Sequence, residues 1–217
     1  MHKGVSYDPY RPQSQTMNYR PITDVWILAR PKVKYYGAYP NGFMERARAL
    51  LGVTPYDPVL HVCGGSARDY PAKPRGFGWQ DHTLDLDPAL NPDFTQDATA
   101  PLPLRICSDA TCLECTDGNW HTGVKGHSWS ALIADPPYTE ADADHYTPGS
   151  AAFPKANLIL KRMLEVVRPG GRVGMLHYLL PQPPREGVRF VACIGVICGY
   201  NNRMRCFSVF ERDDDRG

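Results

Sequence analysis

The stretch ALIADPPY, residues 131–138, is an apolar run that ends at an acid followed by two prolines and a tyrosine. A short apolar run bounded by turn residues is typical of a buried strand. Each proline fixes its own φ, removes a backbone donor and pushes the residue before it out of the helical region. The corner after the strand is therefore stiff and extended, and it holds the Asp135 carboxylate and the Tyr138 ring in a fixed relation.

Further apolar runs and helical periodicities lie on both sides of this stretch. Runs typical of strands occupy residues 22–29, 58–65, 82–88 and 172–181, and two more flank a GYNNR turn within residues 190–212. Apolar residues at helical spacing occur in residues 41–53, where Gly52 predicts the end of a helix. They occur again in residues 154–171, where Pro169-Gly170-Gly171 predicts the end of a second helix. Strands that alternate with helices and close in a hairpin predict an α/β fold. We expect a Rossmann-like, mostly parallel sheet with an antiparallel C-terminal hairpin.

Length and composition limit the classes of protein to consider. A chain of 217 residues with a net charge of +1 predicts one domain and no global basic field. We expect residues 1–22 to form a poorly ordered N-terminal arm and residues 23–217 to form a single domain. No apolar run is long enough to span a membrane, and the N-terminus lacks the apolar core of a signal peptide. Seven irregularly spaced cysteines argue against a disulfide framework. We therefore expect a cytoplasmic protein without membrane contact.

Chemically notable residues fall at the ends of the predicted strands, where ligands bind in parallel α/β sheets. The strand before Cys63 runs into Gly64, Gly65 and Ser66, and glycine lets the backbone approach a ligand closely. The next strand ends at Asp85 and Asp87, and an acid in that place can accept hydrogen bonds from both hydroxyls of a ribose. Asp97 follows a short apolar step, where it could meet an adenine amino group. Taken singly each residue also fits an ordinary turn or solvated strand end, so the order and spacing carry the prediction.

These motifs together resemble the S-adenosylmethionine-dependent amino-methyltransferases, which methylate exocyclic nitrogens of bases in DNA. DPPY (135–138) matches their catalytic motif (D/N/S)PP(Y/F), and VLHVCGGSARD (59–69) looks like their glycine-rich cofactor motif. LDLDP, QDATAPLP and KYYGAYPNGFMERARALLG look like further cofactor motifs, and RPGGRVGMLHYLLP looks like the strand after the catalytic loop. The resemblance covers roughly residues 24–212, is nearest to small phage or prophage members, and implies a Rossmann-like class I methyltransferase fold.

The resemblance also implies roles for particular residues. The Asp135 carboxylate and the Pro136 carbonyl would accept the two hydrogens of a base amino group that has left the duplex stack, with Pro137 holding the loop rigid and Tyr138 stacking on the base. The residues implied to bind S-adenosylmethionine are Tyr39, Pro40, His61, Cys63, Gly64, Gly65, Ser66, Asp85, Asp87, Asp97 and Ala98.

The favoured substrate is N6 of adenine in DNA, because aspartate-headed motifs are frequent there, and N4 of cytosine is the near alternative. RNA methylation at N2 of guanine or N6 of adenine shares the motif. A rival from another class is a degenerate module that binds cofactor and nucleic acid without turnover. His61 at the position of the usual acid, and CGGSA in place of GxGxG, motivate that rival, whereas the intact DPPY opposes it.

Two further features bear on partners. Cys107, Cys112 and Cys115, followed by His121 with His127 as its alternative, have spacing that suits a structural zinc ion, although free cysteines and histidines are the alternative interpretation. We expect this Cys/His-rich insertion, at about residues 105–128, to lie beside the active site. Too few residues of this sequence lie outside the predicted catalytic core to build a separate target-recognition domain, so we expect weak discrimination by a single chain and a DNA site that is short, read by a homodimer, or largely relaxed. Arg203 and Arg205, on the predicted hairpin, suit phosphate contacts or a solvated face equally well.

Overall fold

The computed structural model describes residues 21–30, 38–70, 76–106, 126–146, 153–199 and 201–213. Its elements follow in chain order. They are β1 (Ile22–Leu28), α1 (Phe43–Leu51), β2 (Val59–Val62), η1 (Ala67–Asp69), β3 (His82–Asp85), η2 (Pro88–Leu90), β4 (Phe94–Thr95), β5 (Arg105–Ile106), β6 (Gly126–His127), β7 (Trp129–Ala134), α2 (Glu140–Tyr146), α3 (Ala156–Val166), β8 (Val167–His177), β9 (Val188–Cys198) and β10 (Asn201–Arg212).

The described strands form an eight-stranded sheet in the order β1-β9-β10-β8-β7-β2-β3-β4, and β5 pairs separately with β6. From β2 the chain builds outward through β3 and β4 toward one edge, and from β7 it builds through β8 toward the other. The junction of β2 and β7 is therefore the switch point of the sheet, where a crevice opens beyond the strand ends. The predicted α/β Rossmann-like fold is confirmed at this level, and the strand order fits the class I arrangement.

Strand β10 runs antiparallel to both of its neighbours, β8 and β9. All other neighbours in the sheet are parallel: β1 with β9, β8 with β7, β7 with β2, β2 with β3, and β3 with β4. The predicted antiparallel C-terminal hairpin is thus confirmed. A reversed strand begins at the edge where its neighbours end. The first residues of β10 therefore lie at the same edge of the sheet as the ends of β7 and β8.

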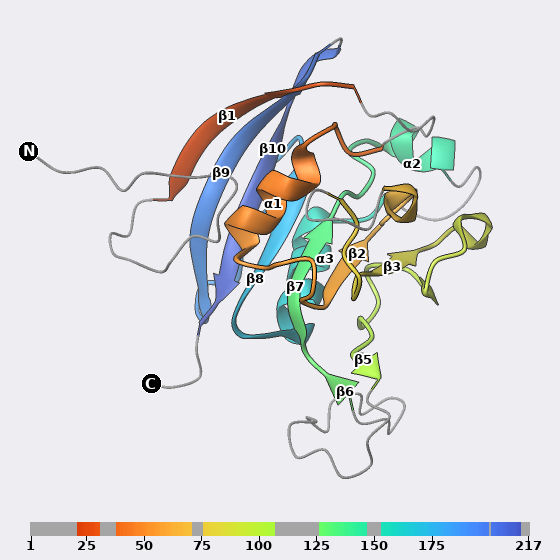
Figure 1. Cartoon of the computed structure of the whole chain (residues 1–217), viewed down its shortest axis with the longest axis vertical. Coiled ribbons are helices and arrows are strands. Elements are labelled where there is room, and N and C mark those ends of the chain that lie inside the picture. Colours follow the sequence, from red (N-terminus) through yellow and green to blue (C-terminus); the bar gives the residue numbers. More distant parts are fainter. Residues whose placement is uncertain are drawn as a thin grey trace, which may run out of the picture.

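Helices cover both faces of the sheet (Figure 1). One apolar cluster joins α1 to one face through Phe43, Ala47 and Leu50. A second cluster joins α3 to the other face through Ile159 and Met163. All five side chains are fully buried. Two buried layers against one sheet explain why the central strand β7 is buried at every position and, apart from Ser130, apolar, since neither of its faces meets water.

Helix α1 ends as the sequence predicts, but α3 does not. Gly52 follows α1 at a φ of 70° and its N–H bonds to the Ala49 carbonyl, which is the usual helix stop at glycine. Helix α3 ends at Val166, and β8 begins at once and runs through Pro169, so the prediction that Pro169-Gly170-Gly171 stops the helix is corrected. Gly170 at a φ of 70° lets the strand pass this point, where the pairing of β7 with β8 shifts register.

The ends of the predicted arm and insertion also differ from expectation. Ile22 opens β1, so the last residue of the predicted arm belongs to the sheet, and residues 1–20 lie outside the described residues. Strands β5 and β6 carry the root of the Cys/His-rich insertion, and β6 leads directly into the start of β7. That root therefore lies at the opposite end of β7 from Asp135, toward the bottom of Figure 1. Among the described residues, no helix is long and apolar enough to cross a membrane.

Candidate active site

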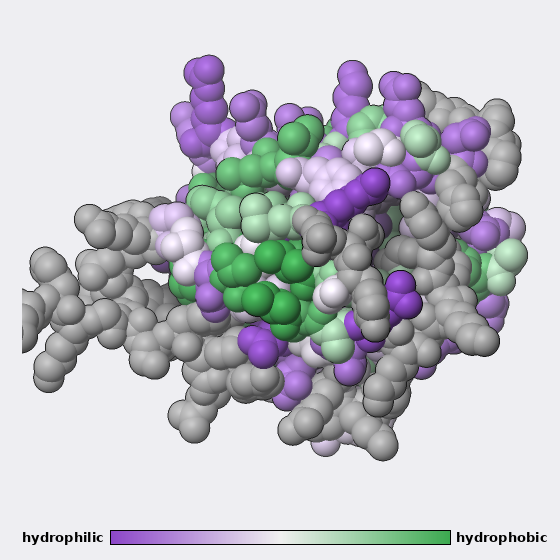
Figure 2. All heavy atoms as spheres, turned by 90° about the horizontal axis from the view of Figure 1, so that it is seen from above, coloured by the Kyte–Doolittle hydropathy of each residue, from purple (hydrophilic) through white to green (hydrophobic). Residues whose placement is uncertain are grey.

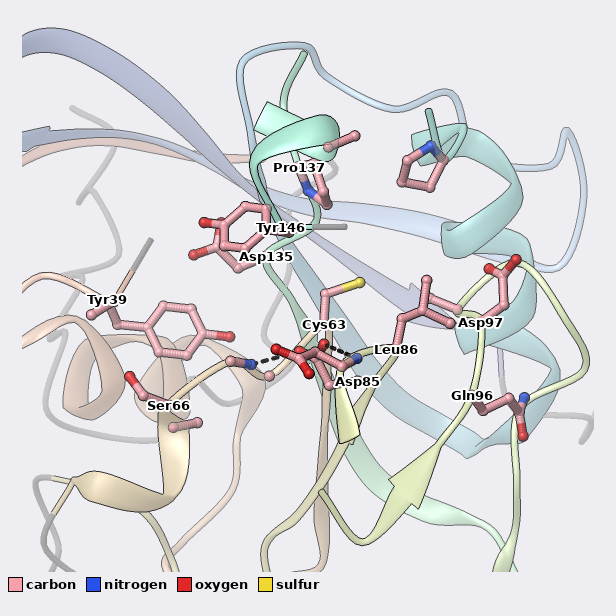
Figure 3. A pocket seen from close by; sticks show the side chains of 18 of the residues that line it. Tyr39, Cys63, Ser66, Asp85, Leu86, Gln96, Asp97, Asp135, Pro137 and Tyr146 are labelled. Carbon is pink, nitrogen blue, oxygen red and sulfur yellow. Dashed lines mark hydrogen bonds between the residues drawn. The ribbon is translucent and has the colours of Figure 1, made fainter. Parts of the chain in front are cut away.

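A pocket opens beyond the ends of β2, β3, β4 and β7, at the switch point of the sheet (Figure 3). Most of the predicted site residues line it. They are Tyr39, Cys63, Gly64, Gly65, Ser66, Asp85, Asp87, Asp97, Ala98, Asp135 and Pro137. Figure 2 looks onto the molecule from above, with apolar residues in the middle of the view and hydrophilic residues around them.

The turn after β2 forms the floor of the pocket through close backbone packing. A Cβ on Gly64 would lie 3.0 Å from the His61 carbonyl oxygen and 3.3 Å from the Thr83 Cβ, so only glycine fits without a shift. Gly65 has a φ of 50° and Cys63 a φ of 53°, both in the left-handed region. For a cysteine that conformation stores strain of order 1–3 kcal/mol, which the surrounding contacts must offset. The CGGSA segment thus makes a tight turn although it lacks the GxGxG pattern.

Asp85 ties this turn to the end of β3. Its Oδ2 accepts a hydrogen bond of 2.9 Å from the Gly65 N–H, and its Oδ1 accepts one of 3.1 Å from the Asp87 N–H. Burial raises the pKa of Asp85 above its ordinary value, against the lowering effect of these backbone donors. Asp87 instead turns to η2, where its Oδ1 accepts from the Ala89 N–H at 2.8 Å. Asp85 is therefore the acid at the centre of the pocket (Figure 3).

Tyr39 and Ser66 lie together on one side of Asp85, and Asp97 lies on the other (Figure 3). Within the described residues, neither the Tyr39 hydroxyl nor the Ser66 hydroxyl has a hydrogen-bond partner, although both oxygens are buried. Buried polar groups are normally paired, so two orphans in one pocket indicate a place for polar atoms of a ligand. Asp97 accepts at 2.8 Å from both the N–H and the hydroxyl of Thr99, which fixes its carboxylate at the far end.

Asp135 follows β7 and forms the wall above Cys63 in Figure 3. Its backbone N–H bonds to the Val62 carbonyl at 3.3 Å, which anchors the corner to β2. Burial raises the pKa of Asp135 to about 6, against the lowering effects of the Arg205 charge and of the hydrogen bond that the Tyr138 hydroxyl donates to Oδ1. A carboxylate with this pKa changes its charge just below neutral pH.

Tyr138 is not among the residues that line the pocket, and its stacking on a base stays a prediction. Its hydroxyl points to Asp135, and its ring contacts Tyr178 at 4.6 Å and His177 at 5.6 Å between centroids. The Arg205 guanidinium carbon lies 5.8 Å from the same ring centroid. Through its hydroxyl Tyr138 supports the Asp135 carboxylate.

His61 also lies outside the pocket, in a buried polar network beneath the turn. Its Nε2 is 2.9 Å from Asp81 Oδ2, which also accepts from the Gly78 N–H at 2.8 Å and pairs with Arg48. Burial by itself would raise the pKa of Asp81, but His61, Arg48 and the Gly78 N–H bring it below the ordinary value. His61 therefore supports β2 from the protein interior through Asp81, and the structure does not place it among the residues that line the pocket.

Other predicted residues take supporting positions, and the pocket has further lining residues that were not predicted. Pro40 and Pro136 are buried and do not line the pocket, and the Pro40 carbonyl accepts from the Phe43 N–H at the start of α1. The unpredicted lining residues are Ala38, Ala67, Tyr70, Leu86, Gln96, Ala143, Tyr146 and Pro154. Ala38, Ala67, Leu86 and Gln96 lie within the sequence motifs quoted above, and Tyr70 follows the glycine-rich motif, so the motifs were a usable signal for these five. Nothing in the local sequence marks Ala143, Tyr146 and Pro154.

The zinc prediction concerns residues that lie mostly outside the described part of the chain. Cys107, Cys112, Cys115 and His121 lie outside the described residues, and His127 lies in β6. Within the described part of the chain, no group of three or more potential metal ligands comes together. The zinc site stays a prediction, and the root of its segment is remote from the pocket.

Comparison with known proteins gives a likeness at the level of structure. No protein-family model matches the chain, and no curated protein matches it. Among solved structures, TrmN from Thermus thermophilus is 17% identical with a TM-score of 0.47, covering 78% of this chain and 48% of its own. A SAM-dependent methyltransferase from Aquifex aeolicus is 12% identical with a TM-score of 0.43, covering 79% and 89%. The N-methyltransferase NodS from Bradyrhizobium japonicum, in complex with S-adenosyl-L-homocysteine, is 10% identical with a TM-score of 0.42, covering 79% and 89%.

This chain thus spans about half the length of TrmN. Likeness at these identities and TM-scores carries no functional argument.

Proposed function

We propose that this chain is an S-adenosylmethionine-dependent methyltransferase acting on an exocyclic amino group of a base in DNA, with N6 of adenine as the favoured target. The observation that carries the proposal is that Asp135, at the end of β7, lines the same pocket as Asp85 and the Gly64-Gly65 turn. One cavity thus combines groups suited to a nucleoside with an acceptor suited to an amine.

The described residues fit the proposed cofactor. A carboxylate has about four lone-pair sites, so Asp85 can accept from two ribose hydroxyls beyond its two backbone donors. The orphan hydroxyls of Tyr39 and Ser66 suit the polar amino-acid end, and Asp97 suits an adenine amino group. The aspartates of the pocket also favour a cationic ligand. When bound, S-adenosylmethionine supplies an electrophilic methyl group on a positively charged sulfur.

Asp135 would act on the nucleophile. A base amino group is a poor nucleophile because its lone pair is delocalised into the ring. An ionised carboxylate that accepts one N–H hydrogen favours a pyramidal nitrogen and directs its lone pair toward the reacting carbon, so the contribution is orientation and electrostatic preorganisation. With a pKa of about 6, Asp135 is mostly ionised at pH 7 to 8. The Pro136 carbonyl as a second acceptor rests on the sequence resemblance, since Pro136 is buried away from the pocket.

Binding to DNA requires cations that are available to the phosphates, and three arginines of the described residues are engaged elsewhere. Arg48 is buried in the Asp81 network, Arg46 lies over the Trp26 ring at 5.7 Å, and Arg205 is directed to Tyr138. These cations are therefore already engaged within the fold. We expect phosphate contacts to be few, so both the affinity for DNA and its dependence on salt should be modest.

A methyl-transfer assay separates the proposal from its rivals. The purified chain is incubated with S-adenosylmethionine carrying a tritiated methyl group and with duplex DNA, single-stranded DNA or RNA, and the products are digested to nucleosides. N6-methyl-2′-deoxyadenosine from either DNA substrate supports the proposal, and N4-methyl-2′-deoxycytidine moves the target base. Label in RNA alone replaces DNA with RNA as substrate. Cofactor binding without label in any polymer favours the degenerate module.

A further inference from the structure

Strand β10 reaches the candidate active site through its first residues. Because β10 runs antiparallel to β8, Cys206 pairs with His177, the last residue of β8. Arg205 precedes Cys206 and therefore lies at the edge where β7 ends in Asp135. This placement follows from the reversed strand and could not follow from a fully parallel sheet.

Three groups form a chain of contacts at this edge. The Arg205 Nη1 donates a hydrogen bond of 3.1 Å to the Tyr138 hydroxyl oxygen, and the Tyr138 hydroxyl donates to Asp135 Oδ1. The guanidinium also lies over the Tyr138 ring, at 5.8 Å from its centroid. A phenol that accepts from a cation becomes a stronger donor, and a cation on an aromatic face holds the ring in place.

We propose that Arg205 is a positioning residue that, through the Tyr138 hydroxyl, keeps the Asp135 carboxylate ionised and oriented into the pocket. The role of Asp135 toward an amine rests on the proposed function, but the contact chain itself does not. The contact chain explains why a tyrosine in the DPPY segment turns away from the pocket. It also assigns Arg205 a task other than phosphate contact.

The other groups near Asp135 do not replace this cation. Cys63, Tyr39 and Tyr70 line the same pocket as Asp135, and burial and, in part, the Asp135 charge raise the pKa values of their side chains. These three groups are therefore neutral at ordinary pH. Tyr146 of α2 lies beside Asp135 in Figure 3. His177, packed on the Tyr138 ring, has a pKa lowered by burial and is neutral near pH 7.

A titration of Asp135 tests the proposal without requiring turnover. The side-chain carboxyl carbons of aspartate are labelled with carbon-13, and the Asp135 resonance is assigned by its loss in Asp135→Asn. Wild type is compared with Arg205→Gln, Arg205→Lys and Tyr138→Phe. Arg168→Gln is the matched control, since it removes the same charge from an exposed residue at the far end of β8. Arg168 adjoins Val167, which pairs with Trp129, so about seven strand steps, roughly 20 Å, separate it from His177, and this exceeds the screening length in 0.1 M salt.

We expect Arg205→Gln to raise the pKa of Asp135 by about one pH unit or more, as loss of a nearby opposite charge does. Arg205→Lys should restore part of this change, and Arg168→Gln should cause none. Tyr138→Phe should also raise the pKa, because it removes the donor while the cation stays. If Arg205→Gln unfolds the chain, Tyr138→Phe alone decides the question. The proposal is overturned if Asp135 keeps its wild-type pKa in a folded Arg205→Gln variant. If Arg205→Gln does not fold, a wild-type pKa of Asp135 in Tyr138→Phe overturns it.

The outcome is independent of the proposed function. A chain that methylates no nucleic acid can still show the rise in pKa, which would support the positioning role and contradict only the assigned reaction. Where wild type does transfer methyl groups, Arg205→Gln should move the acidic limb of kcat to higher pH while KM for S-adenosylmethionine stays near wild type. A residue with a purely structural role would not shift that limb.

Discussion

Replacing Asp85 with alanine tests the cofactor end of the pocket. In the proposed complex its carboxylate accepts from ribose hydroxyls, and a hydrogen bond to a charged group contributes about 1.5–3 kcal/mol. Loss of a single such bond lowers affinity by roughly tenfold or more, since 1.4 kcal/mol corresponds to a factor of about ten. We therefore expect Asp85→Ala to weaken binding of S-adenosylmethionine, and of its demethylated product, by at least this factor.

The fold should respond less than the affinity does. Asp85→Ala leaves the N–H groups of Gly65 and Asp87 without their acceptor, at a cost of about 1 kcal/mol each. Burial of the Asp85 charge, visible in its raised pKa, costs stability in the wild type and offsets part of that loss. Thermal unfolding beside the binding measurement separates the two effects.

Isothermal titration calorimetry of wild type, Asp85→Ala and Asp87→Ala measures the affinity. Asp87 is the matched control, because it lies two residues away in the same pocket but its side chain is turned to the Ala89 N–H. We expect Asp87→Ala to keep the wild-type affinity within about threefold, well under the tenfold effect of one charged hydrogen bond. A tenfold loss in Asp87→Ala with wild-type binding in Asp85→Ala would show that the wrong acid has been assigned. Wild-type binding in both variants would refute the ribose contact altogether.

Three further predictions concern stability, the turn and recognition. The pKa of Asp135 is about 6 in the folded protein and 3.8 ordinarily, so the free energy of unfolding falls as pH rises from about 4 to 6. Asp135→Asn should therefore be more stable than wild type above pH 6, by as much as ~3 kcal/mol, and equally stable below pH 4. Urea unfolding at several pH values measures this difference. Gly64→Ala should cost about 1–3 kcal/mol of stability and weaken cofactor binding, because its Cβ would crowd His61 and Thr83; a neutral result would mean that the turn relaxes freely. Long-read sequencing of DNA from cells expressing the protein should show a short or relaxed methylated site, whereas a strictly read site of five or more base pairs made by a monomer would contradict this.

The sequence predicted the sheet well because its signals are local. Apolar runs ending in acids, the glycine pair and the DPPY corner each place a residue at a strand end, and a parallel sheet brings such ends together. The pocket accordingly contains Asp85, Asp97 and Asp135, as expected. The end of α3 was misjudged because Pro169 and Gly170 fit a turn, while Val167 and Arg172 on either side of them pair with β7 and keep this stretch in the strand.

The remaining errors are about the direction in which a side chain points, which depends on distant elements. His61 was assigned to the cofactor because it occupies the position of an acid, but Asp81, twenty residues later, draws it into the interior. Tyr138 was assigned to the base, and that role stays a prediction, while its hydroxyl bonds to Asp135 and to Arg205 from β10. The insertion was expected beside the site; residues 107–125 lie outside the described residues, and the root lies at the other end of β7. None of these partners is visible in the neighbouring sequence.

The role of Asp135 is the central claim, and one comparison tests it most directly. Transfer of a tritiated methyl group from S-adenosylmethionine to DNA is measured for wild type and Asp135→Ala, with the affinity for the cofactor measured on the same preparations. We expect wild-type transfer, loss of transfer in Asp135→Ala, and unchanged binding of the cofactor in the variant. Transfer by Asp135→Ala within about tenfold of wild type, equivalent to about 1.4 kcal/mol in the barrier, would contradict the account.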